Sequence, residues 1–260
     1  MIERARLLGI GLVLLIACAR ASAQFGGPEP FGWSRSDADA TWVFWTSFVD
    51  PAGGNPPVEE SPAPRPTGFS TPDVVALSPT TFRTGSFNLY DSDNVPSFEV
   101  RVPQFARRGG YVTKLVVSLS TLGNPPDTAT FRVNGVGALG EPDVINSIFL
   151  GPPGPFGGTL IDQQMAFELP GSVDEYVFAF TGSDVSVSLD QVGIDAFPVL
   201  RGCSTGDLAE PFGVISQADV AEFVDAFFVS SPLVDYVEPF DVISQADVAA
   251  FIDLFFVGCP

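Results

Sequence analysis

The side chains of this chain that could do chemistry are carboxylates and a few cysteines, because the 260-residue sequence contains no histidine. That absence excludes a Ser-His-Asp hydrolase, a histidine-ligated zinc site and a histidine general base. Acidic residues outnumber basic ones by 31 to 12, which gives a formal net charge of −19 at pH 7. Such a surface repels phosphate groups, so we expect neither nucleic acid nor anionic membranes among the partners.

The carboxylates are most regular near the C-terminus, where one segment occurs twice. Residues 207–229 and 235–257 give 23 aligned positions, of which 17 are identical. Each copy begins with a loop that contains two acids, and a serine and an aspartate follow at the start of a predicted helix. The recurring oxygen-bearing side chains are Asp207, Glu210, Ser216 and Asp219, then Asp235, Glu238, Ser244 and Asp247.

Each copy predicts one amphipathic helix. Ser216 and Ser244 are expected as N-caps, with an aspartate three residues later in place of the usual Glu or Gln of a capping box. Apolar residues then recur at i, i+3, i+4, i+7 and i+8, which predicts a single apolar stripe. One helix cannot bury such a stripe alone, so we expect the two stripes to pack together with pseudo-twofold symmetry. The stripes are Val220, Phe223, Val224, Phe227 and Phe228, and Val248, Phe251, Ile252, Phe255 and Phe256.

The first 23 residues are typical of a secretory signal peptide. An apolar run at 7–17 follows two arginines, and ASA at 21–23 forms a cleavage site. That run is too short to span a bilayer, and no later run is long enough, so we expect an exported chain without a transmembrane segment. A lipoprotein is the alternative, since residues 15–18 resemble a lipobox that would leave Cys18 lipidated.

Cys203 and Cys259 bracket the repeated region. In an exported protein two such cysteines predict a disulfide, and two free thiols are the alternative. Closing a loop of this length would stabilise the fold by about 4 kcal/mol on the chain-entropy model. A module with so thin a core is expected to need such a covalent link.

The C-terminal segment, CSTGDLAEPFGVISQADVAEFVDAFF with its second copy and the ending VGCP, resembles the GC-type dockerin of exported bacterial proteins. Dockerins are paired half-EF-hand modules that dock onto a partner module and tether whatever precedes them. The resemblance therefore implies that residues 201–260 anchor the chain to a cohesin-like or cell-envelope protein.

The resemblance also raises the question of calcium. A calcium-binding loop of this type has oxygen ligands at positions 1, 3, 5 and 12 and glycine at 6. Here Asp207 and Asp219 are 12 residues apart instead of 11, and Ala209 occupies the place of the second ligand. Two alternatives remain: degenerate Ca²⁺ sites built from the eight recurring side chains named above, or a metal-free helix pair. The seven Asp and three Glu of residues 203–260, without any Lys or Arg, favour cations.

Residues 24–200 predict a different architecture. Gly and Pro are dense, and runs with period-two alternation recur between turn signals, as in SFEVRV at 97–102 and EYVFAFTG at 175–182. No amphipathic helix interrupts them, which favours a mainly β, antiparallel sandwich. The apolar parity flips after Leu189, which predicts a β-bulge near Asp190 and Gln191.

The segment SVSLDQVGIDAF at 186–197 is similar to the closing strand of carbohydrate-binding jelly rolls. That resemblance implies a jelly-roll-like sandwich that stacks exposed aromatic rings on the sugar faces of a polysaccharide. A purely structural role of the sandwich is the other possibility, and packing in the core is the alternative for each aromatic residue. The candidates for stacking are Trp33, Trp42, Trp45, Tyr90 and Tyr111.

A glycosidase or lyase with paired carboxylates is the alternative from another functional class. Acids are plentiful, but no spacing marks a pair. We therefore expect a non-catalytic, exported cell-surface or extracellular protein, whose C-terminal module anchors a β-sandwich of binding or structural role.

Overall fold

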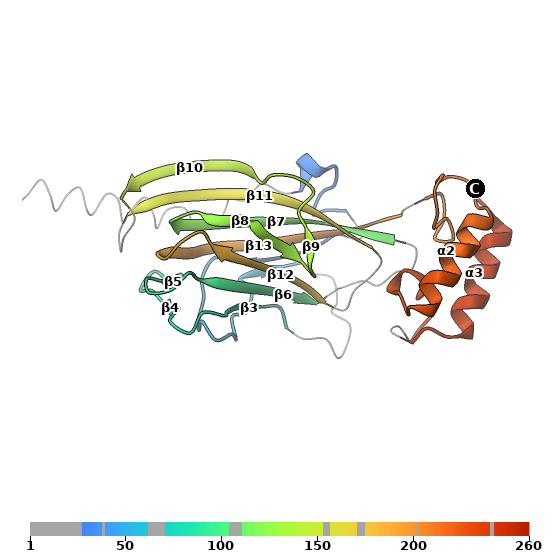
Figure 1. The fold of residues 1–260 in the computed structure, drawn as a ribbon, viewed down its shortest axis with the longest axis horizontal. Helices are drawn as coiled ribbons and strands as arrows, with labels where there is room; N and C mark the ends of the chain where they lie inside the picture. Colours follow the sequence, from blue (N-terminus) through green and yellow to red (C-terminus); the bar gives the residue numbers. More distant parts are fainter. Residues whose placement is uncertain are drawn as a thin grey trace, which may run out of the picture.

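The computed structural model describes residues 28–37, 40–61, 71–103, 111–152, 157–170, 175–200, 202–239 and 242–259. The predicted signal peptide and Cys18 lie outside these residues. The described chain forms a β-rich body and, at one end of it, a pair of helices (Figure 1). The elements are η1 (Glu29–Phe31), β1 (Thr41–Trp45), β2 (Glu59–Glu60), β3 (Asp73–Ala76), β4 (Phe82–Arg83), β5 (Leu89–Asp91), β6 (Ser97–Pro103), β7 (Tyr111–Gly123), β8 (Pro126–Val133), β9 (Val136–Gly137), β10 (Asp143–Gly151), β11 (Gly158–Pro170), β12 (Glu175–Gly182), β13 (Val187–Leu200), α2 (Gln217–Phe228), η2 (Pro232–Val234) and α3 (Gln245–Val257).

The strands form two antiparallel sheets, which confirms the predicted β-sandwich with a small helical part. The larger sheet has the order β10-β11-β7-β13-β1-β2, with β5 also paired to β13 and β4 paired to β5. The smaller sheet has the order β3-β6-β12-β8-β9. In Figure 1 the two sheets overlap in the view, with β10 and β11 along the upper margin of the β-rich body and β6 and β3 along the lower.

The core lies between the sheets and follows the predicted alternation. Phe98, Val100 and Val102 of β6 face inward, as do Tyr176, Phe178 and Phe180 of β12. In β13, the register with β7 shifts between Leu189 and Gln191, so the predicted bulge near Asp190 is confirmed. The bulge lets β13 keep apolar residues on its inner face on both sides of the parity change. The inward residues after it are Val192, Ile194 and Ala196.

A tight turn joins β8 to β9. Arg132 pairs with Gly137 and Val133 pairs with Val136, so Asn134 and Gly135 form a two-residue loop. Their φ angles are 49° and 82°, the left-handed values that a hairpin turn of this kind requires.

One face of the larger sheet is turned away from the core and is covered by the N-terminal segment. Trp33 and Ala40 of that segment pack against Val116 of β7, with Phe31 and Phe197 at the margin of the cluster. Strand β7 is therefore buried on both faces, although its sequence alternation alone predicts one buried face.

The helical module has the predicted helices and caps. The hydroxyls of Ser216 and Ser244 accept the backbone N–H groups of Ala218 and Ala246, each at 3.1 Å. Both copies form complete capping boxes, in which an aspartate replaces the usual Glu. No helix in the described part of the chain is long and apolar enough to cross a membrane.

Candidate functional site

Each loop of the C-terminal module is closed by a carboxylate from the first turn of the following helix. Asp219 Oδ1 accepts the backbone N–H groups of Leu208 at 2.7 Å and Ala209 at 2.8 Å. Its Oδ2 accepts the backbone N–H of Ser216 at 2.6 Å and the hydroxyl of the same residue at 3.2 Å. Each oxygen of Asp219 therefore takes two hydrogen bonds, and together they tie the loop to the helix.

The second copy repeats this arrangement. Asp247 Oδ1 accepts the N–H groups of Tyr236 at 2.8 Å and Val237 at 3.0 Å, and Oδ2 accepts the N–H of Ser244 at 2.8 Å. Burial works against ionisation of both aspartates, but the backbone hydrogen bonds outweigh it and lower the pKa of each carboxyl below its ordinary value of 3.8. Both side chains are therefore anions at neutral pH and fill the loops with negative charge.

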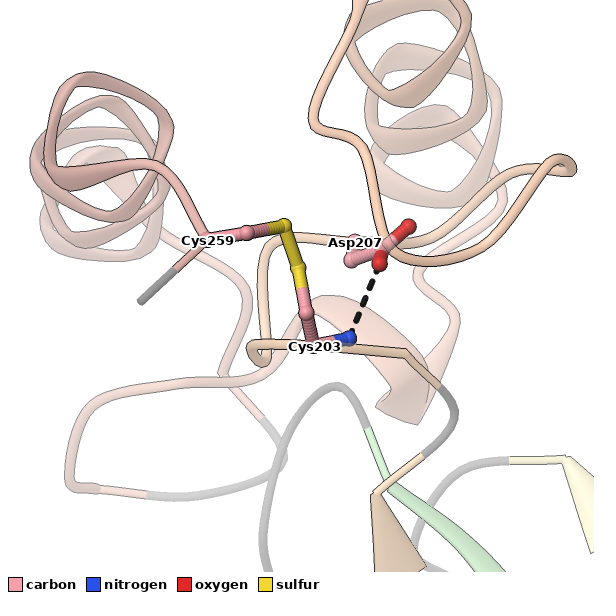
Figure 2. Close-up of side chains that lie close together, drawn as sticks. All are labelled: Cys203, Asp207 and Cys259. Carbon is pink, nitrogen blue, oxygen red and sulfur yellow. Dashed lines mark hydrogen bonds between the residues drawn. A yellow bond between two sulfur atoms is a disulfide. The ribbon is translucent and has the colours of Figure 1, made fainter.

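Asp207, the first acid of the first loop, is fully buried beside the Cys203–Cys259 disulfide (Figure 2). The bond confirms the predicted pairing and joins Cα atoms 5.4 Å apart. Asp207 Oδ2 accepts the N–H groups of Cys203 at 2.9 Å and Gly213 at 2.6 Å, whereas Oδ1 has no hydrogen-bond partner among the described residues. This aspartate therefore holds the beginning of the loop close to the disulfide.

The eight predicted calcium ligands do not form a cage in the described residues. Glu210 and Glu238 are exposed. Within the ranges given above, only one group of at least three Cys, Asp or Glu side chains has ligand atoms that all lie within 4.8 Å of one another. This group is Cys203, Asp207 and Cys259. Two of these residues are joined as a disulfide, and cysteine binds metals as a thiolate. As arranged, the oxygens do not fit the six to eight ligands that calcium takes, and calcium binding stays a prediction.

Helices α2 and α3 meet through the same residue of each copy. The rings of Phe223 and Phe251 stack with centroids 4.2 Å apart. Leu254, near the end of α3, lies against Gly206 of the first loop, the loop that Asp219 binds at the start of α2. The end of α3 is therefore beside the start of α2, so the helices are antiparallel and related by a pseudo-twofold axis.

The predicted apolar stripe is only partly buried, which corrects the expectation from sequence. The buried residues of α2 are Asp219, Phe223 and Ala226. Because the carboxylate of Asp219 must face the loop amides, it fixes the rotation of the helix about its axis. The apolar side chains that this rotation leaves at the surface of α2 are Val220, Val224 and Phe228.

Helix α3 exposes equivalent side chains. Phe228 and Phe256 occupy the same position of the two copies and are 80% and 82% exposed. A twofold axis that exchanges two antiparallel helices is perpendicular to the plane that contains both helix axes. Equivalent side chains of the two helices therefore lie on the same side of that plane. Asp225 and Asp253 are also exposed on these helices. We call the apolar surface the helix-pair face; it consists of Val220, Val224, Phe228, Ile252 and Phe256.

Two of the five predicted sugar-stacking residues are core residues, which corrects that prediction for them. Trp33 is 5% exposed and stacks on Phe197, with ring centroids 5.4 Å apart. Trp45 is fully buried, and its indole N–H donates to the backbone oxygen of Asn55 at 2.7 Å. Trp45 belongs to the core between the sheets and Trp33 to the apolar cluster on the outer face of the larger sheet, so both are packing residues.

The other three candidates are half-buried and do not form a row. Along β13, Trp42 is opposite Asp195, Tyr90 is opposite Ser188 and Tyr111 is opposite Leu200. Sugar-stacking platforms place rings side by side, whereas these positions are spread over the whole length of the strand. The structure therefore brings none of the five together.

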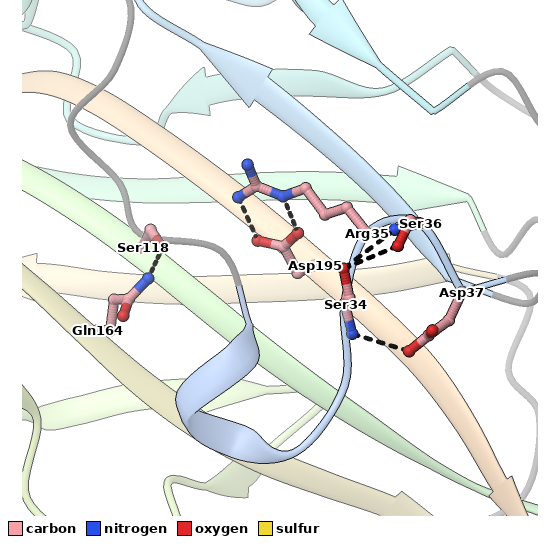
Figure 3. A network of polar contacts seen from close by, with 7 residues as sticks. All are labelled: Ser34, Arg35, Ser36, Asp37, Ser118, Gln164 and Asp195. Carbon is pink, nitrogen blue, oxygen red and sulfur yellow. Dashed lines mark hydrogen bonds and ion pairs between the residues drawn. The ribbon is translucent and has the colours of Figure 1, made fainter.

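The outer face of the larger sheet holds an ion pair that the sequence analysis missed. Arg35, on the N-terminal segment, forms two parallel hydrogen bonds to the buried carboxylate of Asp195 on β13, one of them at 2.9 Å (Figure 3). Its guanidinium also lies 4.2 Å from the ring centroid of Phe44. The contact spans 160 residues of sequence, so no local pattern could have indicated it.

Buried polar side chains continue along the same face. Gln164 donates to Ser118 at 2.9 Å, Ser120 donates to Asp162 at 2.6 Å, and Asn146 donates to Asp162 at 2.9 Å. These residues alternate with core residues along β7 and β11, and that alternation is the signal from which they could have been found. The contacts link three neighbouring strands, β10, β11 and β7.

One buried acid of the sandwich, Asp91, is surrounded by hydrogen-bond donors. Asp91 accepts the hydroxyls of Ser78 and Thr80 and the N–H groups of Asp93 and Asn94. Burial opposes its ionisation, but these hydrogen bonds outweigh burial and lower its pKa to about 2. Asp91 is therefore an anion that fastens the turn before β6.

In comparisons with known proteins, no family model, curated protein or solved structure matches the chain.

Proposed function

We propose that this chain is a secreted, non-catalytic cell-surface or extracellular protein whose C-terminal helix pair docks onto a partner and anchors the β-sandwich. The observation that carries the proposal is the helix-pair face. Phe223 and Phe251 already fill the space between the helices, yet equivalent apolar side chains of both copies stay exposed. Contiguous exposed apolar patches of this kind mark interaction sites in soluble proteins.

The charges around the face indicate the chemistry of the partner. Residues 203–260 contain ten acids and neither Lys nor Arg. Electrostatic complementarity then calls for an apolar patch with Lys or Arg at its rim, as a cohesin-like or cell-envelope protein could present. A second copy of the module would bring together two surfaces of the same negative sign, which opposes self-association there.

Such docking would tether the sandwich, which would then have a binding or a structural role. If the sandwich binds a ligand, the proposed ligand class is polysaccharide. The accessible aromatic side chains for that role are Trp42, Tyr90 and Tyr111.

Docking through the helix-pair face is tested with a Phe228→Ala, Phe256→Ala double variant. Cells that secrete the full chain are separated into envelope and medium, and the chain is quantified in each. We expect the wild type in the envelope fraction and the double variant in the medium. Leu139→Ala is the control, because Leu139 is 64% exposed and lies outside both the module and β10. Equal envelope retention of all three proteins would overturn the proposed face.

Binding and catalysis by the sandwich are separated by one paired assay. The chain is incubated with insoluble polysaccharides, and both its co-sedimentation and the release of reducing sugar are measured. Co-sedimentation that Trp42→Ala abolishes would assign polysaccharide binding to the larger sheet. Release of reducing sugar would contradict a non-catalytic protein and favour a tethered glycosidase or lyase.

A further inference from the structure

Strand β10 is the end strand of the larger sheet. It pairs with β11 along one side, from Asp143 opposite Gln164 to Gly151 opposite Gly158. Along its other side no strand of the described residues pairs with it, and it forms the outermost ribbon of the sheet in Figure 1. A free strand edge presents unpaired N–H and C=O groups to any strand that can approach.

The composition of β10 does not protect this edge. Its nine residues, DVINSIFLG, contain one charge, that of Asp143, and neither lysine nor proline. Natural edge strands usually avoid pairing by carrying charges or proline, by being very short, or by bulges that twist the edge away. Of these devices β10 has only bulges, and they leave its central residues regular. The exposed apolar side chains of β10 are Val144, Ile145, Phe149 and Leu150.

The other sheet ends are protected by charge, by shortness or by a covering loop. At the opposite end of the larger sheet, β2 consists of two exposed glutamates, Glu59 and Glu60. In the smaller sheet, β9 is two residues long, and β3 is bonded along its outer edge to the preceding loop, through Ala76 N–H to Pro51 O and Asn55 Nδ2 to Val74 O. The exception is therefore specific to β10, the longest of these end strands.

A second copy of the chain is the occupant that fits this edge. The whole chain carries a net charge of −19, so two copies repel each other over most of their surfaces. At β10 each copy brings only Asp143, and hence two copies meet there with little repulsion. Twofold pairing presents the same strand twice, so its apolar residues must also match one another.

Strand geometry fixes the register of such a pair. Directly opposite residues of antiparallel strands share one face of the sheet, so a twofold pair must be centred on a residue and not between two. Centring on Ser147 places Ile145 opposite Phe149 and Val144 opposite Leu150, each twice by symmetry. Bulges beside Ile145 and Leu150 bend β10 along its pairing with β11, and the four residues between them run regularly.

We propose that two copies of the chain associate through antiparallel pairing of their β10 strands, centred on Ser147, so that the two larger sheets become continuous. The apolar side chains exposed on one copy are then covered by those of the other. This contact is separate from the helix-pair face and does not depend on it.

The mass of the purified full chain is measured by light scattering and by sedimentation over a range of concentrations. We expect a concentration-dependent dimer. An Ile145→Lys, Phe149→Lys double variant should weaken the dimer about tenfold or more, because each lysine faces a lysine of the other copy. Both side chains are exposed, so the fold should persist. Val95→Lys is the control, since Val95 is exposed to the same degree as Ile145, and it should dimerise like the wild type.

The register is tested with Ser147→Cys, which would place two thiols directly opposite each other, within the Cα separation that a disulfide spans. We expect rapid oxidation to a covalent dimer, and no such dimer from Thr128→Cys, an exposed residue of β8. A chain that is monomeric at every concentration overturns the proposal. So does a dimer that survives the two lysines, or one that is lost only in the Phe228→Ala, Phe256→Ala variant.

Discussion

The carboxylate of Asp219 accepts the backbone N–H of Leu208 at 2.7 Å, which joins the first turn of α2 to the loop eleven residues earlier. Asp247 makes the equivalent bond to Tyr236 at 2.8 Å. In an EF-hand-type loop a cation gathers the surrounding oxygens, whereas in this module an anion gathers the surrounding N–H groups. The module can therefore close its two loops with its own side chains.

We expect Asp219→Asn to lower the free energy of unfolding of the helical module by about 2 kcal/mol. The neutral amide offers one acceptor oxygen where the carboxylate offers two, and hydrogen bonds to a charged group contribute about this much. Urea unfolding followed by the helical circular dichroism signal measures the change. Asp225→Asn is the control, because Asp225 is exposed on the same helix, and it should change stability little.

The stability of the module should also depend on acid pH. The pKa values of Asp219 and Asp247 are lowered in the folded state. Both ionised carboxyls therefore stabilise the fold at pH values above their ordinary pKa of 3.8. This contribution is lost as the pH falls through the lower folded pKa. We expect the stability difference between wild type and Asp219→Asn to shrink below about pH 4. A difference that stays constant from neutral to strongly acidic pH would sink this explanation.

Calcium should not stabilise the module. Asp219 and Asp247 already direct their oxygens at backbone N–H groups, so an ion would have to displace those bonds. We expect no heat on titration with Ca²⁺ and no change in Tm on adding EDTA. A saturable heat that Asp207→Asn abolishes would contradict this and would locate the ion at the Asp207 oxygen that has no hydrogen-bond partner.

Much of the fold could be predicted because its signals are local or covalent. The bulge near Asp190 follows from a change of apolar parity within one strand, and the turn at Asn134 and Gly135 follows from two residues. The Cys203–Cys259 disulfide follows from the positions of two cysteines in a chain with a predicted signal peptide. Each of these features needs no knowledge of distant segments.

The features that could not be predicted depend on distant contacts. The sequence pattern treats all apolar positions of α2 as equivalent, but the bond from Asp219 to the loop decides that Phe223 is buried and Phe228 is exposed. Trp33 is buried because the N-terminal segment crosses the larger sheet. This crossing stacks the Trp33 ring on Phe197, which lies 164 positions later in the sequence. Nothing near Trp33 in the sequence reports that crossing.

Removing the disulfide should destabilise the helical module alone. The bond closes a loop across a sequence separation of 56 residues, and the chain-entropy model assigns about 4 kcal/mol to a loop of that size. We expect a Cys203→Ser, Cys259→Ser variant to lose its helical signal at lower urea than the wild type. Tryptophan fluorescence is the internal control, because all three tryptophans lie in the first 45 residues and should report unchanged unfolding.

Arg35→Ala should destabilise the β-sandwich by about 3 kcal/mol. The substitution removes the cation from a fully buried carboxylate, Asp195, and breaking a buried ion pair from one side is far more costly than breaking an exposed one. Arg101→Ala is the matched control, since the Arg101–Glu99 pair is more exposed and should contribute less than about 1 kcal/mol. Urea unfolding of both variants is followed by tryptophan fluorescence, to which Trp42, 5.6 Å from the Arg35 guanidinium, contributes. Equal losses in the two variants would mean that the N-terminal segment is not held by this ion pair, and its cover over the larger sheet would then rest on Trp33 and Phe197.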